Sequence, residues 1–438
     1  MSAGFTYPDQ LEIQPFTGRP LSVSVSVPGS KSITNRALVL AALASQSNEC
    51  ELVDALQSED TEVMVDCLKR LGFQIEADGP TVRIGKNDSG RIIPASAADL
   101  FVANSGTTVR FLTAMLALGT GTYRLDGVPR MRERPIQDLL DALTELGVQA
   151  TSDRGTGCPP ITLKSSGLQS NRVCVRADVS SQFLSALLMA APFAGREMTI
   201  EVEGPVVSEP YIEMTLRMME AWGDIFTRGN TPNAYTVLPH GSSPAPSHYA
   251  IEPDASAASY FFAAAAILGG QVTVENLTLE SLQGDVHFVD VLQQMGCRIE
   301  TCDAGITVHG GPLRGIDIDM NAISDTVMTL GAVACFADGP TRIRNVAHIR
   351  HKETDRIFAL ATELRRLGAE VEEFEDGLKI TPRPLHGATV ETYNDHRMAM
   401  SLALIGLKVP GVVIKNSGCV AKTYPGFWQD FEKLNNSK

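Results

Sequence analysis

Basic side chains stand at the beginning of segments that otherwise consist of small apolar residues. Lys31, Ser32 and Arg36 open KSITNRALVLAALA, and Arg397 leads directly into MAMSLALIGL. The first turn of a helix has free N–H groups and a partial positive charge, so these positions suit an anion. Helices this apolar should be buried, and a buried cation is costly unless it meets an anion. The residues predict a site for phosphate or carboxylate groups, although spacing alone also allows a solvated helix end at Lys31 and Arg36.

The densest run of charges is HKETDR at residues 351–356. Lys352 and Arg356 are four residues apart, so on one helix they would share a face and repel unless an anion or carboxylates compensate them. Glu353 would then lie beside the anion, poised for proton transfer. The alternative is a solvated face, on which Lys352–Asp355 and Arg356 pairs need no ligand.

Uncharged hydrogen-bond donors open two further apolar segments. They are NSGT at residues 104–107 and SSQ at residues 180–182. Gly106 lets the backbone approach a ligand closely, and hydroxyl and amide groups suit phosphate oxygens. Each cluster can also be an ordinary helix cap that needs no ligand. The three arginines of RMRERP, which ends at Pro135, are either solvated or an anion clamp.

Several common motifs are missing from the sequence. The segment PGSKS at residues 28–32 lacks the Gly-Lys pair of a P-loop, and there is no Gly-x-Ser-x-Gly motif of a serine hydrolase. His396 has no second His or Cys at ligand spacing. We therefore expect neither a metal nor another cofactor.

Composition narrows the class of partner. A net charge of −14 argues against nucleic acid or an anionic membrane, so a local basic site must hold any anionic partner. The eight cysteines never form Cys-x-x-Cys, which is typical of a reducing cytoplasm. The longest uncharged apolar run, residues 259–270, is short of the ~20 residues that cross a bilayer, and no secretory signal is visible. We expect a cytoplasmic protein.

A repeat must position these residues. Six apolar helices begin at intervals of 75, 74, 74, 71 and 71 residues. A β-rich run, a second helix and two short strands around a turn follow the apolar helix, which predicts six βαβαββ units. The anchors at which the apolar helices begin are Lys31, Gly106, Ser180, Asp254, Asp325 and His396.

The units group into two α/β domains of three repeats each. The segment PHGSSPAPS at residues 239–247 is the clearest candidate for a linker. We expect an N-terminal domain over 22–250 and a C-terminal domain over 1–21 and 251–438, with the active site in the cleft between them. The alternative is an open repeat array used as a scaffold, but these units are far longer than solenoid repeats.

The order of the motifs over about residues 22 to 430 resembles the 5-enolpyruvylshikimate-3-phosphate synthase family. The resemblance rests on Lys31-Ser32 with Arg36, Asn104-x-Gly106-Thr107, the arginine run ending at Arg134, Ser180-Ser181-Gln182, Ser208-x-Pro210-Tyr211, Asp254-Ala255-Ser256, Lys352-Glu353-Thr354-Asp355-Arg356, Asn394-Asp395-His396-Arg397 and Ala421-Lys422-Thr423. It implies two domains of three βαβαββ repeats each, in an inverse α/β-barrel-like fold. It also implies that the N-terminal strand packs with the second domain.

The same resemblance implies a reaction. The family transfers the enolpyruvyl group of phosphoenolpyruvate to the 5-hydroxyl of shikimate 3-phosphate and releases phosphate, in the biosynthesis of aromatic amino acids. The two small molecules are the implied partners of a chain that we expect to be a monomer. Addition and then elimination pass through a tetrahedral intermediate, for which Asp325 and Glu353 would be the acid/base pair, with Lys31 as a third catalytic residue that stabilises charge.

By resemblance, two overlapping sets of residues hold the substrates. The set for shikimate 3-phosphate is Lys31, Ser32, Arg36, Ser180, Ser181, Gln182, Ser208, Tyr211, Asp325, His348 and Lys352. The set for phosphoenolpyruvate is Lys31, Asn104, Gly106, Arg134, Gln182, Arg356, Arg397 and Lys422.

The sequence departs from the family pattern at a few positions. His348 stands where Asn is usual, and Ala103, Ser105 and Phe111 replace the usual Gly, Ala and Pro around the Asn104–Gly106 turn. The last three flank the implied phosphoenolpyruvate pocket and so bear on inhibition by glyphosate, the family inhibitor.

Two other functions compete with this one. The sister UDP-N-acetylglucosamine enolpyruvyl transferases share the fold and the donor, but they usually carry a Cys in the loop before the Arg-Pro helix, and DGVPRMRERPI has none. A non-enzymatic phosphosugar-binding protein would use the same cations but would not need Asp325 and Glu353.

Overall fold

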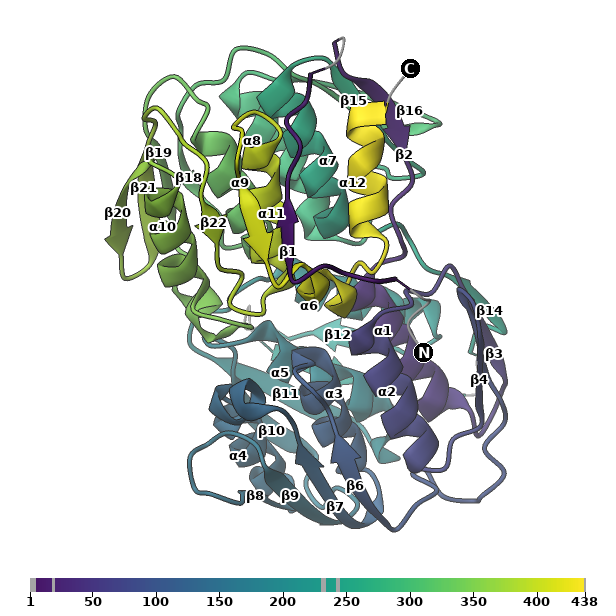
Figure 1. Cartoon of the computed structure of the whole chain (residues 1–438). Helices are drawn as coiled ribbons and strands as arrows, with labels where there is room; N and C mark the ends of the chain where they lie inside the picture. The colour runs from purple at the N-terminus through teal and green to yellow at the C-terminus, as the bar shows by residue number, and fades with distance from the viewer. Residues whose placement is uncertain (1–4, 18–19, 230–233, 242–244, 437–438) are drawn as a thin grey trace. The chain divides into compact units, whose positions relative to one another are not determined.

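The computed structural model describes residues 5–17, 20–229, 234–241 and 245–436 (Figure 1). The six predicted apolar helices are present, and they begin within two residues of the predicted anchors. Nearly every residue in them is buried, including all of those from His396 to Gly406. These helices are α1 (Lys31–Ala44), α3 (Gly106–Leu116), α5 (Ser181–Ala190), α7 (Ala255–Leu268), α9 (Val327–Ala334) and α11 (His396–Gly406).

A second helix follows the buried one in each repeat and covers the outside of the unit. These helices are α2 (Glu59–Arg70), α4 (Gln137–Glu145), α6 (Pro210–Ala221), α8 (Phe288–Met295), α10 (Arg356–Arg366) and α12 (Phe427–Asn436). The first five are followed by a glycine with positive φ, a backbone that stops a helix. The glycines are Gly72, Gly147, Gly223, Gly296 and Gly368.

In the part of the chain that the structure describes, the strands form six small sheets, one for each repeat. Five have four strands, with one parallel pair and two antiparallel pairs, such as the order β6-β7-β9-β8. The strands of that sheet are β6 (Ala97–Phe101), β7 (Thr120–Asp126), β8 (Gln149–Ser152) and β9 (Ile161–Ser166). The α/β class and the repeated βαβαββ unit are therefore as predicted.

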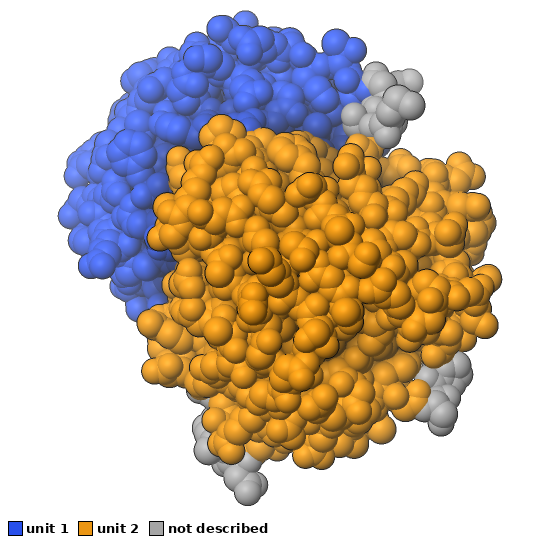
Figure 2. All heavy atoms as spheres, turned by 90° about the horizontal axis from the view of Figure 1, so that it is seen from below, with its two compact units in different colours: residues 1–28, 252–438 blue, residues 29–251 orange. Residues whose placement is uncertain are grey.

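The chain divides into two compact units (Figure 2): residues 29–251, and residues 1–28 with 252–438. We call them the N-terminal and C-terminal units. Within the N-terminal unit α1, α3 and α5 pack against one another, and within the C-terminal unit α7, α9 and α11 do so. The anchors of three repeats thus come together at one end of each helix bundle.

The predicted boundary at residue 22 is wrong, because two strands are exchanged between repeats. Strand β2 (Ser22–Val25) precedes α1, yet it pairs in parallel with β15 (Gln271–Glu275) of the C-terminal unit. Strand β14 (His248–Ala250) precedes α7, yet it pairs in parallel with β3 (Cys50–Val53) of the N-terminal unit. The chain therefore passes from one unit to the other after Pro28 and after Ile251.

The predicted linker at residues 239–247 is wrong for a related reason. His240 donates its backbone N–H to Pro192, and the carbonyl oxygen of Ala245 accepts a hydrogen bond from Asn48. Both contacts lie inside the N-terminal unit, so the segment leads to β14 instead of connecting the units. Residues 242–244 lie outside the described part of the chain.

Within the described ranges the sixth repeat lacks its closing hairpin, which differs from the prediction of six full copies. Its sheet has three strands, in the order β1-β23-β22, and β1 (Gln10–Glu12) from the start of the chain pairs antiparallel with β23 (Val413–Lys415). β22 (Thr389–Val390) completes it. The N-terminal strand thus fills the place of the hairpin that closes the other sheets.

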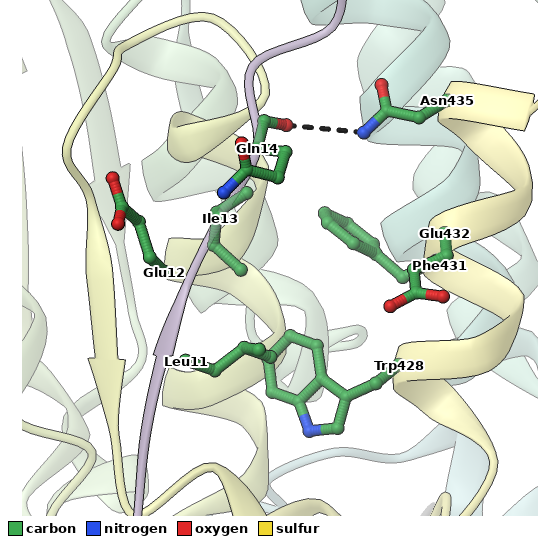
Figure 3. Close-up of a pocket in the computed structure, with 8 residues that line it drawn as sticks. All are labelled: Leu11, Glu12, Ile13, Gln14, Trp428, Phe431, Glu432 and Asn435. Carbon is green, nitrogen blue, oxygen red and sulfur yellow. Dashed lines mark hydrogen bonds between the residues drawn. The ribbon is translucent and has the colours of Figure 1, made fainter. Parts of the chain in front are cut away.

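A cavity of about 260 Å³ lies between β1 and α12. Trp428 and Phe431 of α12 turn toward β1 there, and Asn435 donates a hydrogen bond to the carbonyl oxygen of Gln14 (Figure 3). None of the predicted site residues lines this cavity. Its lining residues are Leu11, Glu12, Ile13, Gln14, Trp428, Phe431, Glu432 and Asn435.

Candidate active site

Helix caps account for part of the polar clusters of the N-terminal unit. The hydroxyl of Ser105 accepts a hydrogen bond from the N–H of Thr108, and that of Ser180 accepts one from the N–H of Gln182. Ser30 caps α1 in the same way, which leaves Lys31 and Ser32 in its first turn. The capping alternative thus holds for Ser105 and Ser180. These caps fix the backbone at Gly106 and at Gln182.

Arg36 is fully buried among neutral groups. Its Nε donates to Thr215 Oγ1 at 2.7 Å, its Nη1 to the carbonyl oxygen of Ser32 at 3.0 Å, and its Nη2 to the carbonyl oxygen of Tyr211 at 3.1 Å. The Phe111 ring also lies under the guanidinium, with its centroid 5.1 Å from Cζ. Burial lowers the pKa of Arg36 to about 10, so it stays charged at neutral pH.

No carboxylate is paired with Arg36 among the residues that the structure describes. A buried cation held only by neutral acceptors is an electrostatically favourable place for an anion. The solvated-end alternative is therefore wrong for Arg36. Lys31 differs, because its Nζ lies 3.7 Å from the buried carboxylate of Asp60, at the start of α2.

The three arginines before Pro135 divide into two kinds. Arg130 pairs with Glu133 at 2.9 Å and Arg132 with Asp126 at 2.8 Å, and both are partly exposed. Arg134 is buried, and its Nη1 donates to the carbonyl oxygen of Asn104 at 2.8 Å. Arg134 alone is therefore placed at the start of α3.

The approach of Arg134 explains two residues of the neighbouring turn. A Cβ atom on Gly106 would lie 2.5 Å from Arg134 Nη2, so only glycine leaves room for the guanidinium. Ala103 has a φ of +46°, in the left-handed region that costs a residue with a Cβ atom about 1–2 kcal/mol. A glycine at this position would adopt that backbone without strain.

Three further predicted residues of this unit lie near the starts of α5 and α6, and one of them contacts Arg36. Tyr211, in the first turn of α6, has its ring centroid 5.9 Å from Arg36 Cζ. Ser208 is buried just before α6 and has a φ of +53°. Ser181 is buried in the first turn of α5, beside Gln182.

Arg356 organises the site residues of the C-terminal unit. Its Nη1 donates to Asp325 at 3.0 Å, its Nη2 to Glu353 at 2.8 Å, and its Nε to Asp395 at 2.8 Å. Burial by itself would lower the pKa of Arg356, but Asp395, Glu353 and Asp325 together raise it above its ordinary value. The carboxylates and the guanidinium form one buried ion cluster.

Asp325 connects this cluster to two further cations. It lies in the turn Ser324–Thr326 before α9, and it accepts a hydrogen bond of 2.7 Å from Arg397 Nη2. Lys352 Nζ lies 3.7 Å away from it. Carboxylates thus compensate the charges of Lys352, Arg356 and Arg397. For Lys352 and Arg356 the sequence predicted compensation by an anion or by carboxylates, and the structure shows carboxylates.

Two details of the 351–356 run differ from prediction. Helix α10 begins at Arg356, so Lys352 and Glu353 lie in the turn before it and Lys352 shares no helix face with Arg356. The solvated face with a Lys352–Asp355 pair is also wrong. Asp355 caps α10 and pairs with Arg350 at 2.8 Å. Lys352, in the turn before α10, lies near Asp325 instead.

His348 is buried and uncharged at neutral pH. Its Nε2 lies 2.9 Å from the hydroxyl of Ser324, the neighbour of Asp325. Burial, followed by the nearby charge of Lys352, lowers the pKa of His348 to about 3. Lys422, the other predicted cation, is buried at the end of the turn Ser417–Lys422, which packs against α11.

Sequence reasoning missed several residues around these groups. Asp395 is fully buried, caps α11 through the N–H of Arg397 and binds Arg356. Burial, followed by the charge of Asp325, raises the pKa of buried Asp285 to about 6, and Ser256 donates a hydrogen bond to it. In the N-terminal unit, Arg110 contacts Gln182. Asp395 was visible as an acid before an apolar helix, whereas nothing in the local sequence marks Asp285 or Arg110.

The two units therefore differ in charge. Among the described residues, the N-terminal unit presents Arg36 without an acidic partner, whereas the C-terminal unit has cations and carboxylates in one network. The first can bind an anion, and the second can bind an anion and exchange a proton through Asp325 or Glu353. No group of three or more His, Cys, Asp or Glu with the arrangement of a metal site occurs within the described ranges. None of the helices in those ranges is long and apolar enough to span a membrane.

Comparisons with known proteins point in one direction. The family model of EPSP synthase (3-phosphoshikimate 1-carboxyvinyltransferase) matches residues 16–431. A 3-phosphoshikimate 1-carboxyvinyltransferase of Nostoc punctiforme is 51% identical over 428 residues, which cover 97% of this chain and 99% of that protein. The chloroplastic enzyme of Arabidopsis thaliana is 42% identical over 97% of this chain and 84% of its own length.

Solved structures agree on the fold. EPSP synthase from Acinetobacter baumannii superposes with a TM-score of 0.79 at 25% identity, covering 97% of this chain and 98% of that one. The enolpyruvyl transferase NikO from Streptomyces tendae has a TM-score of 0.72 at 21% identity, with 97% of both chains covered.

Proposed function

The chain belongs to the EPSP synthase family, and from this premise we propose how its residues carry out the reaction. The enzyme transfers the enolpyruvyl group of phosphoenolpyruvate to the 5-hydroxyl of shikimate 3-phosphate and releases phosphate. This places it in the biosynthesis of aromatic amino acids. Both substrates are anions, in agreement with buried cations in a protein whose net charge is −14.

Shikimate 3-phosphate binds chiefly to the N-terminal unit in this proposal. The unpaired charge of buried Arg36 supports its role there, together with Lys31 and the hydroxyl groups around it. The residues assigned to this substrate are Lys31, Ser32, Arg36, Ser180, Ser181, Gln182, Ser208, Tyr211, Asp325, His348 and Lys352.

We assign phosphoenolpyruvate to a second set of residues, most of them cations. The closeness of Arg134 to the glycine at the start of α3 supports an anion at that helix end. The residues assigned to this substrate are Lys31, Asn104, Gly106, Arg134, Gln182, Arg356, Arg397 and Lys422.

The observation that carries the mechanism is the contact of Arg356 with both Asp325 and Glu353. It holds two carboxylates beside the cations that neutralise the donor. In the addition, the 5-hydroxyl oxygen bonds to C2 of phosphoenolpyruvate, a carboxylate takes the hydroxyl proton, and C3 gains a proton. In the elimination, C3 loses a proton and the C2–O bond to phosphate breaks, so that phosphate leaves.

Asp325 and Glu353 form the acid/base pair for these transfers, and Lys31 stabilises the charge that develops. Arg397 and Lys352 lie beside Asp325, with contacts of 2.7 and 3.7 Å. The chemistry uses only protein side chains and the two substrates. We further propose that the enzyme acts as a monomer in the cytoplasm.

Phosphate release tests the proposal. The enzyme is mixed with phosphoenolpyruvate and either shikimate 3-phosphate or UDP-N-acetylglucosamine, and inorganic phosphate is measured. We expect release with shikimate 3-phosphate alone. Release with UDP-N-acetylglucosamine alone would assign the sister reaction, and release with neither would favour a binding protein.

A further inference from the structure

Arg110 links three parts of the N-terminal unit. It lies one turn into α3 and is 4% exposed. Its Nη1 donates to Gln182 Oε1 at 2.8 Å, and its Nη2 donates to the carbonyl oxygen of Pro135 at 3.1 Å. The ring of Phe183 lies beside its guanidinium, with the centroid 5.2 Å from Cζ. A single side chain of α3 thus contacts the start of α5 and the segment that follows Arg134.

The contact with Gln182 decides which end of its amide is available. A carboxamide has an oxygen that accepts and an NH₂ group that donates, whereas a guanidinium only donates. The oxygen of Gln182 must therefore face Arg110, and its NH₂ group must face the other way. The backbone N–H of Gln182 is already bound to Ser180, so Nε2 is the donor that this residue can offer a ligand.

We propose that Arg110 is a positioning residue for the reaction, which fixes the amide of Gln182 so that its NH₂ group meets the anionic substrates. Without Arg110 the amide is free to rotate and present its oxygen, which repels phosphate and carboxylate oxygens. The proposal rests on the proposed function, in which Gln182 contacts both substrates. Arg110 itself touches neither.

The second hydrogen bond extends the role to the donor side. Pro135 directly follows Arg134, which contacts the start of α3 through Asn104. Arg110 therefore fixes Gln182 and the Arg134 segment relative to each other. Both residues are assigned to phosphoenolpyruvate, so the binding of this substrate should depend most on Arg110.

A double-mutant cycle tests the proposal. Arg110→Met, Gln182→Ala and the double variant are compared with the wild type for the KM of phosphoenolpyruvate, for kcat, and for shikimate 3-phosphate binding by calorimetry. Hydrogen bonds to charged groups are worth enough to raise KM roughly tenfold in either single variant, with a smaller change in kcat. If Arg110 acts through Gln182, the double variant resembles Gln182→Ala, because the effects of coupled residues are not additive.

Each outcome has a distinct meaning. If Gln182→Ala leaves KM and binding unchanged, the proposed role of Gln182 fails, and that of Arg110 fails with it. If Gln182→Ala raises KM but Arg110→Met adds its own full effect in the double variant, Gln182 keeps its role and the inference about Arg110 is overturned. Arg172→Met, at an exposed arginine paired with Glu201, serves as the control and should change none of these values.

Arg110→Lys covers the case in which Arg110→Met does not fold. Lysine keeps the charge but carries all its donors on a single nitrogen, so we expect it to hold the Gln182 oxygen without reaching the carbonyl oxygen of Pro135 as well. We expect it to recover most of the KM for phosphoenolpyruvate while kcat stays near that of the wild type. Arg110→Lys is also combined with Gln182→Ala. The proposal would be contradicted if Arg110→Lys raised the KM by the same factor in the wild type and in the Gln182→Ala variant.

Discussion

Arg356 donates a hydrogen bond of 3.0 Å to Asp325, so the start of the second helix of the fifth repeat is bound to the turn before the buried helix of the same repeat. The same guanidinium contacts Glu353 and Asp395, and Asp325 also accepts a hydrogen bond from Arg397. The cations expected to bind phosphoenolpyruvate are thus already paired with the carboxylates expected to transfer protons. When phosphoenolpyruvate binds, its anionic groups must replace some of these carboxylate contacts. The binding of this substrate is therefore coupled to the acid/base residues.

Replacing Glu353 with Gln should separate chemistry from binding. Glutamine can still accept the hydrogen bond from Arg356 but cannot take up a proton. General acid–base groups typically contribute 10²–10⁴-fold, so we expect kcat to fall by roughly that factor while the affinity for shikimate 3-phosphate changes little. Steady-state kinetics and calorimetry measure the two quantities. The exposed Glu372→Gln is the control, and a near-normal kcat with a raised KM would assign the proton transfer to Asp325 or Lys31.

Replacing Arg356 with Met should weaken both the fold and donor binding. The change leaves the buried carboxylates of Glu353 and Asp395 without their main countercharge, a loss that typically costs about 3–5 kcal/mol of unfolding free energy. The KM for phosphoenolpyruvate should rise as well. Urea unfolding and kinetics measure these effects, with Arg383→Met, at an exposed arginine paired with the exposed Glu370, as the control. An Arg356→Met variant as stable as the wild type would contradict the structural part of this prediction.

Replacing Arg36 with Met should remove binding without loss of stability. Thr215 and Ser185 remain hydrogen-bonded to each other, and the cost of burying an unpaired cation disappears. We expect the dissociation constant of shikimate 3-phosphate to rise roughly 100-fold. Thermal unfolding with and without this ligand measures the loss: the melting temperature of the wild type rises with ligand and that of Arg36→Met does not. An equal rise in both proteins would exclude Arg36 from the binding site.

Replacing His348 with Asn should stabilise the protein in acid. The folded-state pKa of about 3 lies below the ordinary value of 6.5, so the unfolded chain takes up a proton that the folded protein excludes. Stability is therefore lost as pH falls through 6.5 toward 3, and at pH 5 the loss amounts to about 2 kcal/mol. Urea unfolding should show the His348→Asn variant more stable than the wild type by that amount at pH 5 and equally stable at pH 7.5. An unchanged pH dependence would argue against a buried, neutral His348; exposed His287→Asn is the control.

The regular parts of this protein could be predicted because local patterns determine them. Apolar helices with polar first turns locate the starts of α1, α3, α5, α7 and α11 to within a residue, and glycines after the second helices locate their ends. Burial of Arg36 and Arg397 was expected from the apolar segments around them, whereas the pattern left open whether Arg134 is solvated or binds an anion. The same patterns brought out nearly every group now assigned to the substrates.

Only the tertiary structure shows which strands pair with each other and which side chains form hydrogen bonds with each other. Strands β2 and β14 have the same local pattern whether they pair with their own repeat or with the other one, because a strand's sequence specifies a face and not a partner. The partners of Arg356 and of Arg110 come from residues distant along the chain, and hydrogen bonds over such separations leave no period in the sequence. The residues proposed to bind the anions could therefore be identified from the sequence, whereas the hydrogen-bond network that orients them is seen only in the tertiary structure.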